Sequence, residues 1–99
     1  MKTSQEINIR EQSLIAHIAA AKIGQRNAAI VLGKTIYLYG VSKEVFLQNE
    51  SWLRHELKHV EQFQRYGFAK FICLYLLESM RNGYYNNKFE IEARAAEKC

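Results

Sequence analysis

The first part of the chain carries hydrophobic residues at a helical spacing. From Leu14 to Gly24 they recur every three or four positions, which predicts an amphipathic helix, and Ile7 and Ile9 lead into the same pattern. His17 falls among the apolar residues of this helix. We therefore expect it to be a core or boundary residue with ordinary hydrogen-bond partners, with a role as metal ligand as the less favoured alternative.

The spacing then changes to that of β-strands. Residues 28–32 and 35–40 are rich in β-branched and aromatic side chains, and the Gly-Lys pair between them predicts a β-hairpin. In the second run Ile36 and Leu38 alternate with threonine and tyrosines, so we expect one face of the hairpin to be buried. Such a hairpin could offer a strand edge to an extended peptide, or it could only cover the core.

Helical spacing returns in the remainder of the chain. The predicted helices are a short one over 42–48, one that begins after a cap at Asn49 or Ser51 and stops at Gly67, an apolar one over 68–81, and a last one from about Asn87. The expected fold class is α+β, a mainly helical domain with a β-hairpin before its central helix. Residues 1–99 are expected to form this single domain.

Charge and hydropathy argue against two classes of partner. The formal net charge of +4 is spread along the chain and interleaved with glutamates, so no nucleic-acid partner is expected. No apolar stretch is long enough to span a bilayer, so no transmembrane segment is expected. The most apolar run, 68–77, is interrupted by Lys70 and predicts a buried helix, with contact to a membrane surface or a partner as the alternative.

The cysteines and the first residues bear on the compartment. Residues 1–6 are polar and lack the features of a signal peptide. Cys73 is expected to pack in the core, and a disulfide between Cys73 and Cys99 stays open as an alternative. Two cysteines without an export signal favour a reducing compartment, so a cytoplasmic location is expected.

The segment with the most chemical information is the run HELKH at residues 55–59. On a helix, His55 and His59 lie on one face, so both imidazoles can bind one metal ion. Helical projection places both histidines and Glu56 on the apolar side, where an unpaired carboxylate is costly. We therefore predict a zinc site at the two histidines, with Glu56 as the general base and not as a ligand.

Two histidines leave a catalytic zinc one protein ligand short. Gln62 and Arg65 stand where a metzincin would have its glycine and third histidine, so that class is excluded. The downstream acidic candidates are Glu78, Glu90, Glu92 and Glu97. Glu90 and Glu92 lie about 200° apart on a helix, so they do not face the same metal, and helical projection alone leaves the choice between them open.

Two segments resemble the small bacterial gluzincin-like metallopeptidase domains, several of which have no known function. They are WLRHELKHVEQ at 52–62 and YNNKFEIEAR at 85–94, and the resemblance covers roughly residues 50–96. It implies a zincin-like fold, Zn²⁺ as cofactor, a peptide or protein substrate, and a third ligand in a Glu-x-x-Ala-Asp context, which assigns Glu90. Arg94 stands where the family has its aspartate. An arginine there is expected to pair with Glu90 and weaken its hold on the metal.

Together these features predict a zinc-dependent metallopeptidase. His55, His59 and Glu90 would bind zinc, and Glu56 would accept a proton from a zinc-activated water that attacks a peptide bond. The alternative is a non-catalytic, zinc-stabilised interaction module. The oligomeric state stays open.

Three aromatic residues near these segments have simpler expected roles. Tyr84 and Tyr85 precede the helix of the third ligand and are expected to serve in packing, with stabilisation of an oxyanion by a hydroxyl group as the alternative. Trp52 lies on the inner side of the motif helix and is expected in the core.

Overall fold

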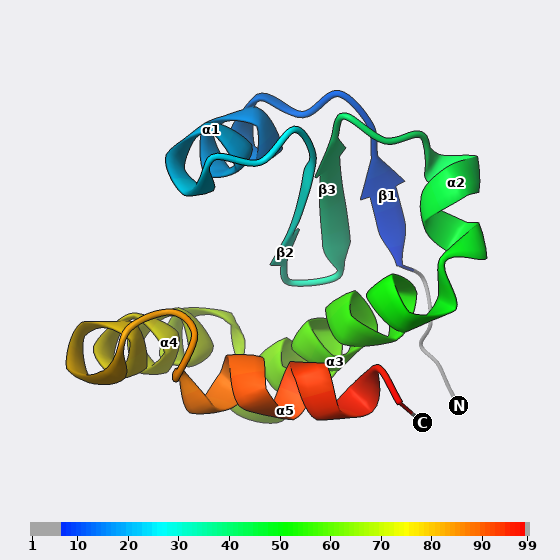
Figure 1. The fold of residues 1–99 in the computed structure, drawn as a ribbon. Helices are drawn as coiled ribbons and strands as arrows, with labels where there is room; N and C mark the ends of the chain where they lie inside the picture. The colour runs from blue at the N-terminus through cyan, green and yellow to red at the C-terminus, as the bar shows by residue number, and fades with distance from the viewer. Residues whose placement is uncertain (1–6, 99) are drawn as a thin grey trace.

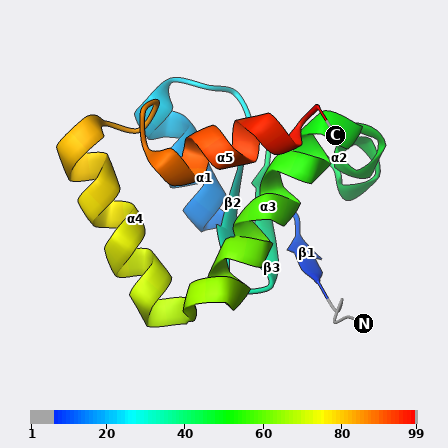
Figure 2. The same ribbon diagram turned by 90° about the horizontal axis from the view of Figure 1, so that it is seen from below.

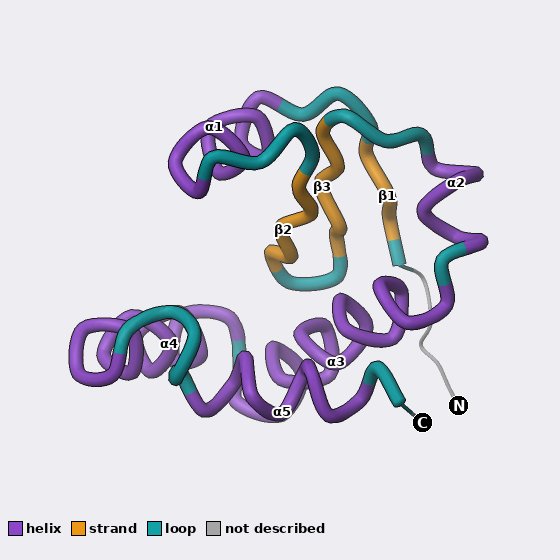
Figure 3. The backbone as a smooth tube through the Cα atoms, viewed as in Figure 1, coloured by secondary structure: helices purple, strands orange, loops and turns teal. Residues whose placement is uncertain are grey.

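The computed structural model describes residues 7–98, apart from the side chain of Ile23. A small sheet is surrounded by helices (Figures 1 and 3), which confirms the expected mainly helical α+β class. The elements in chain order are β1 (Asn8–Arg10), α1 (Leu14–Ile23), β2 (Ala28–Leu32), β3 (Thr35–Tyr39), α2 (Lys43–Gln48), α3 (Glu50–Tyr66), α4 (Phe68–Asn82) and α5 (Lys88–Ala96).

The sheet contains the predicted hairpin and one strand that was not predicted. β2 and β3 pair antiparallel, and β1 pairs parallel with the other side of β3, so the strand order is β1-β3-β2. The expectation that Ile9 leads into a helical run was wrong, because Ile9 lies opposite Ile36 in the parallel ladder. Three residues give almost no alternation to recognise, and the partner strand lies far along the chain, so local spacing carried no sign of this pairing.

Residues of β3 and α1 differ in how far they are buried. Ile36 and Leu38 are buried in the main core, as the alternation predicted. α1 contributes its buried Ala16 to the fold. His17, by contrast, is exposed and stacks on the ring of Tyr39 with the ring centroids 4.2 Å apart. The expected core or boundary position of this histidine was therefore wrong.

α3 is the central helix, and α5 lies beside it (Figure 2). Asn49, and not Ser51, caps α3: its side-chain oxygen accepts a hydrogen bond from the backbone N–H of Trp52 at 3.1 Å. The helix ends at Gly67, whose φ of 88° lies in the region that favours glycine. Trp52 is partly buried against the core and meets Phe46 edge-to-face, in line with its expected packing role.

α4 leaves the body of the molecule after Gly67 (Figure 1), and the expectation of a buried helix was wrong. Phe71 is its buried residue, whereas Leu76, Leu77 and Met80 are exposed. Cys73 is also exposed, which corrects its expected core position, since only one face of this helix meets the rest of the fold. The proposed partner of Cys73, Cys99, and the polar residues 1–6 lie outside the described residues. Within residues 7–98, no helix combines the length and apolarity needed to cross a membrane.

Candidate metal centre

One face of α3 supplies three of the four predicted site residues. His55, Glu56 and His59 point toward the core side of the helix, as the helical projection predicted. Only 6% of Glu56 and 7% of His59 is exposed, and His55 is partly buried. The sequence therefore placed these side chains on the correct face.

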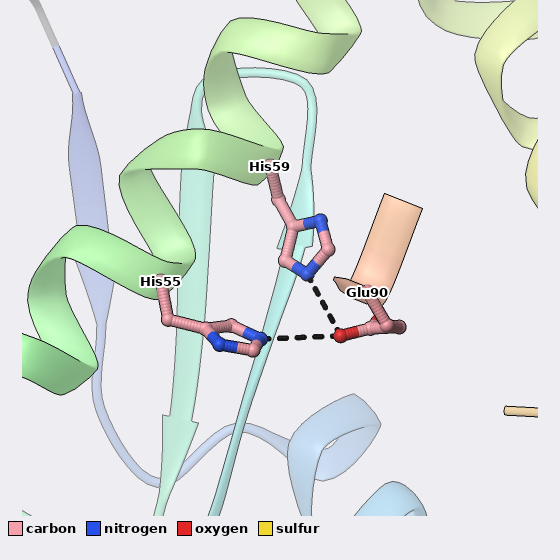
Figure 4. A group of neighbouring side chains, drawn as sticks. All are labelled: His55, His59 and Glu90. Atoms are coloured by element: carbon pink, nitrogen blue, oxygen red, sulfur yellow. Dashed lines mark hydrogen bonds and ion pairs between the residues drawn. The ribbon is translucent and has the colours of Figure 1, made fainter. Parts of the chain in front are cut away.

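Glu90, from the first turn of α5, completes the group (Figure 4). Its Oε1 lies 3.1 Å from Nε2 of His55 and 3.2 Å from Nε2 of His59, and the three donor atoms lie within 4.8 Å of one another. Glu92 points elsewhere, with its Oε1 accepting a hydrogen bond from the side chain of Gln62 at 2.7 Å. The fold thus brings Glu90 to the histidines and leaves Glu92 in a supporting position.

A second set of hydrogen bonds orients both imidazoles. Nδ1 of His55 donates to Oε2 of Glu97 at 2.6 Å, and Nδ1 of His59 donates to Oε1 of Gln62 at 2.9 Å. Gln62 is fully buried and donates in turn to the backbone carbonyl of Phe89 at 3.1 Å. These contacts direct both Nε2 atoms toward Glu90, the arrangement common around histidines that bind metals.

The donor set fits one small divalent cation. All four ring nitrogens face acceptor oxygens, namely Oε1 of Glu90, shared by the two Nε2 atoms, and one oxygen each of Glu97 and Gln62. Without a metal each ring therefore donates from both nitrogens and carries a positive charge. One divalent ion bound to the two Nε2 atoms carries the same charge as the two protons that it replaces. Both Nδ1 hydrogen bonds stay in place. Ligands about 2.0–2.1 Å from a tetrahedral ion lie about 3.3 Å apart, close to the observed 3.1 and 3.2 Å.

The pKa values of the metal-free group follow from the same contacts. Burial alone lowers the pKa of His55, but its hydrogen bonds with Glu90 and Glu97 and the charge of Glu56 outweigh burial and raise the pKa to about 9. His59 follows the same direction: burial lowers its pKa, and Glu90 more than reverses the effect. Burial also works against ionisation of Glu90, yet hydrogen bonds from both histidines hold its pKa well below the usual range.

Glu56 differs from the other carboxylates of the site. It is not among the three residues whose donor atoms converge. Burial is the main cause that raises its pKa to about 7, although the charges of His59 and His55 act in the opposite direction. A buried carboxyl group with a pKa near neutrality is suited to exchange a proton at physiological pH.

Tyr75 was not singled out from the sequence, although it contacts the site directly. Its hydroxyl group donates a short hydrogen bond to Oε2 of Glu90. Asn87, fully buried, connects the two helices involved, because its side-chain amide donates to the carbonyl of Tyr75 at 3.1 Å while its oxygen caps α5. The helical spacing of Tyr75 and Phe71 on α4 was the only sequence signal for this inward position.

Tyr84 lies near the site, whereas Tyr85 and Arg94 contact each other. Tyr84 borders the cleft described below, where burial and the charge of Glu90 raise its pKa to about 12. Tyr85 is exposed, and Arg94 lies over its ring and donates to its carbonyl at 2.6 Å. The expected pairing of Arg94 with Glu90 was wrong, because the guanidinium turns toward Tyr85. The supporting carboxylate is instead Glu97, on the following turn.

A cleft of about 340 Å³ leads to the group. It is bordered by β2, by α3 and by α4, and its lining includes His55, Glu56, His59 and Glu90. β2 is the outer strand of the sheet on this side. The predicted strand edge therefore lies next to the motif helix.

The structure therefore shows a group of two histidines and one glutamate that could hold a metal ion and that lines a cleft. Comparison of the chain with protein-family models, with curated proteins and with solved structures found no match.

Proposed function

We propose that this chain is a zinc-dependent metallopeptidase of the gluzincin type. The observation that carries the proposal is the convergence of His55, His59 and Glu90 beside the buried Glu56, in the lining of a cleft. Two imidazole nitrogens and one carboxylate oxygen form a ligand set of catalytic zinc sites that keep one position open. The resemblance of the two motif segments to gluzincin-like domains supports the same assignment.

Each residue has a distinct role in this proposal. His55, His59 and Glu90 would hold the ion, which when bound supplies Lewis acidity for the attack of water on an amide carbonyl. Glu56 would accept the proton of that water and pass it to the leaving amine. A pKa of about 7 in the metal-free site suits both transfers near neutral pH, and nearby positive charge favours the ionised form that acts as base.

The edge of β2 would position the substrate. Leu38 of β3 pairs with Ala29, and its carbonyl accepts a hydrogen bond from Ser13 on the side away from β2 at 2.8 Å. When one residue of an antiparallel pair points its carbonyl away from the partner strand, the backbone groups of both residues point away from each other. The backbone groups of Ala29, and those of Val31 two positions further along β2, therefore face the cleft. An extended peptide could add there as a further strand.

The decisive experiment separates metal binding from catalysis. Glu56→Gln should retain about one zinc per chain by elemental analysis and lose hydrolysis by several orders of magnitude on any peptide that the wild type cleaves. Glu61→Gln is the matched control, because Glu61 lies on the exposed side of the same helix and pairs with Lys58. A Glu56→Gln variant that cleaves as fast as the wild type would overturn the assigned role.

The second candidate is a zinc-stabilised interaction module without catalysis. Its supporting observation is the exposed apolar surface of α4 at Leu77 and Met80, which the cleft does not include. Retention of Glu56 favours the enzyme, since a purely structural site needs no buried base. Zinc binding without hydrolysis of any peptide in a broad library would favour the module.

A further inference from the structure

The lining of the cleft combines one charged group with a larger set of uncharged residues. The two histidines with Glu56 and Glu90 are the only histidine, acidic or basic side chains among its lining residues in the described part of the chain. The other lining residues are Tyr75 and Tyr84 and a set of apolar residues: Ala19, residues 28–32 of β2, Phe63 and Phe71 near the junction of α3 and α4, and Ile72 and Leu76 on α4. Beyond the catalytic group the walls therefore offer no charged partner to a ligand.

We infer that the cleft accepts an extended polypeptide segment with apolar side chains, held between β2 and α4. The inference rests on the proposed function, because it names the substrate class of the same site. On this assignment β2 binds the backbone of the segment, and Ile72 and Leu76 select its side chains.

The lining explains the preference for apolar side chains. A charged side chain that enters this part of the cleft loses water and meets no opposite charge, which is costly. An apolar side chain removes its own surface and that of Ile72 and Leu76 from water, and this burial favours binding. Leu76 is 56% exposed, so a large part of its side chain is available for such contact.

The strand edge explains the preference for a polypeptide over an acyl chain. The outward backbone groups of Ala29 and Val31 would lose their water when an apolar ligand covers them. An extended peptide replaces those hydrogen bonds with its own N–H and C=O groups, whereas a hydrocarbon chain has none to offer.

Two adjacent residues of α4 provide a matched pair of variants. Leu76 lines the cleft, whereas Leu77 does not, and the two are similarly exposed at 56% and 49%. Leu76→Glu and Leu77→Glu therefore introduce the same charge on the same exposed helix, and both variants should fold, which circular dichroism checks. Only the first places the charge in the proposed binding region.

The experiment measures binding of short labelled peptides to zinc-supplemented Glu56→Gln protein by fluorescence anisotropy. A capped peptide of valine, leucine and isoleucine should bind about tenfold more tightly than one with glutamate and lysine at alternate positions. The same apolar peptide with N-methylated amides should bind clearly more weakly, because it loses the backbone bonds to β2. Leu76→Glu should weaken binding of the apolar peptide about tenfold, and Leu77→Glu less than twofold.

Any of three results would overturn the inference. The charged peptide could bind as tightly as the apolar one, or Leu76→Glu and Leu77→Glu could weaken binding equally. The third result is that a fatty acid displaces the labelled apolar peptide as effectively as the unlabelled peptide does. None of these three results contradicts the proposed function if the zinc-bound wild type still hydrolyses peptides. Conversely, apolar peptides that bind at Leu76 in a protein that holds no zinc would support the cleft assignment and remove the catalytic one.

Discussion

The carboxylate of Glu97 accepts a hydrogen bond from Nδ1 of His55 at 2.6 Å, across 42 positions of the sequence. This contact joins the end of α5 to the middle of α3. It turns Nε2 of His55 toward Glu90, which lies in the first turn of α5, the helix that Glu97 follows. Arg54 reinforces the junction by donating to the backbone carbonyl of Glu97 at 2.6 Å, independently of the Glu97 side chain.

Removal of the Glu97 carboxylate should therefore weaken metal binding without removing a ligand. We expect Glu97→Ala to lower zinc affinity about 10- to 100-fold in a competition titration, as is typical when a partner of a metal-bound histidine is lost. Glu61→Ala, at an exposed position of α3, serves as control and should leave the affinity unchanged. An unchanged affinity in Glu97→Ala would show that the carboxylate does not orient His55 in the bound state.

Glu90 and Glu92 should respond differently to truncation. Glu90→Ala removes the oxygen that lies 3.1 and 3.2 Å from the two imidazoles, so zinc binding should fall sharply. Glu92→Ala removes only a hydrogen bond to Gln62 and a surface contact with Arg65, so the loss should be much smaller. Calorimetric titration of both variants with zinc provides the comparison, and a larger loss in Glu92→Ala would reverse the assignment.

Chelation should destabilise the folded protein. A ligand that binds only the native state at about 100 times its dissociation constant adds about 2.7 kcal/mol to the free energy of unfolding. For a chain of 99 residues, each kcal/mol corresponds to a change in melting temperature of about 4–8 °C. Adding a chelator to zinc-saturated wild type should therefore lower the melting temperature. The same chelator should hardly change the melting temperature of the His59→Ala variant. Differential scanning calorimetry of the two proteins tests this difference.

Stability of the metal-free protein should fall as pH rises through the alkaline range. The pKa of His55 is raised from 6.5 to about 9 in the folded state, so its stabilising contribution is fully present below pH 6.5 and is lost as pH approaches and passes 9. Glu90 has a lowered pKa, so its contribution is present at neutral pH and is lost only in acid. Urea unfolding in chelator at pH 6.5 and pH 9 should show the decrease, and His55→Gln should reduce it.

Asn87 should be important for stability although it is no ligand. Its fully buried side chain caps α5 and donates to Tyr75 and to the hydroxyl group of Ser79 on α4. Asn87→Ala removes the cap of α5 and two part-buried hydrogen bonds to α4, and we expect a loss of about 1–3 kcal/mol in the free energy of unfolding. Asn82→Ala, which removes an exposed contact with Glu78, is the control. Equal losses in the two variants would contradict the proposed role.

The sequence by itself determined the features that depend on neighbouring residues. The spacing of His55 and His59 on one turn of helix placed both rings and Glu56 on the inner face of α3, and a Gly-Lys turn between two β-rich runs specified the hairpin. Local capping signals likewise placed the start of α5 near Asn87 and narrowed the start of α3 to Asn49 or Ser51, since a cap involves only residues within a few positions; the structure selects Asn49.

Only the tertiary structure decided which distant groups meet. The choice of Glu90 over Glu92 depends on how α5 packs beside α3, and helical periodicity left both carboxylates at the flanks of the packed face. The roles of Glu97 and Tyr75 and the turn of Arg94 toward Tyr85 depend on the same packing. α4 shows the limit most clearly: an apolar sequence predicted burial, but burial requires a partner element, and the described fold provides one for only one face of this helix.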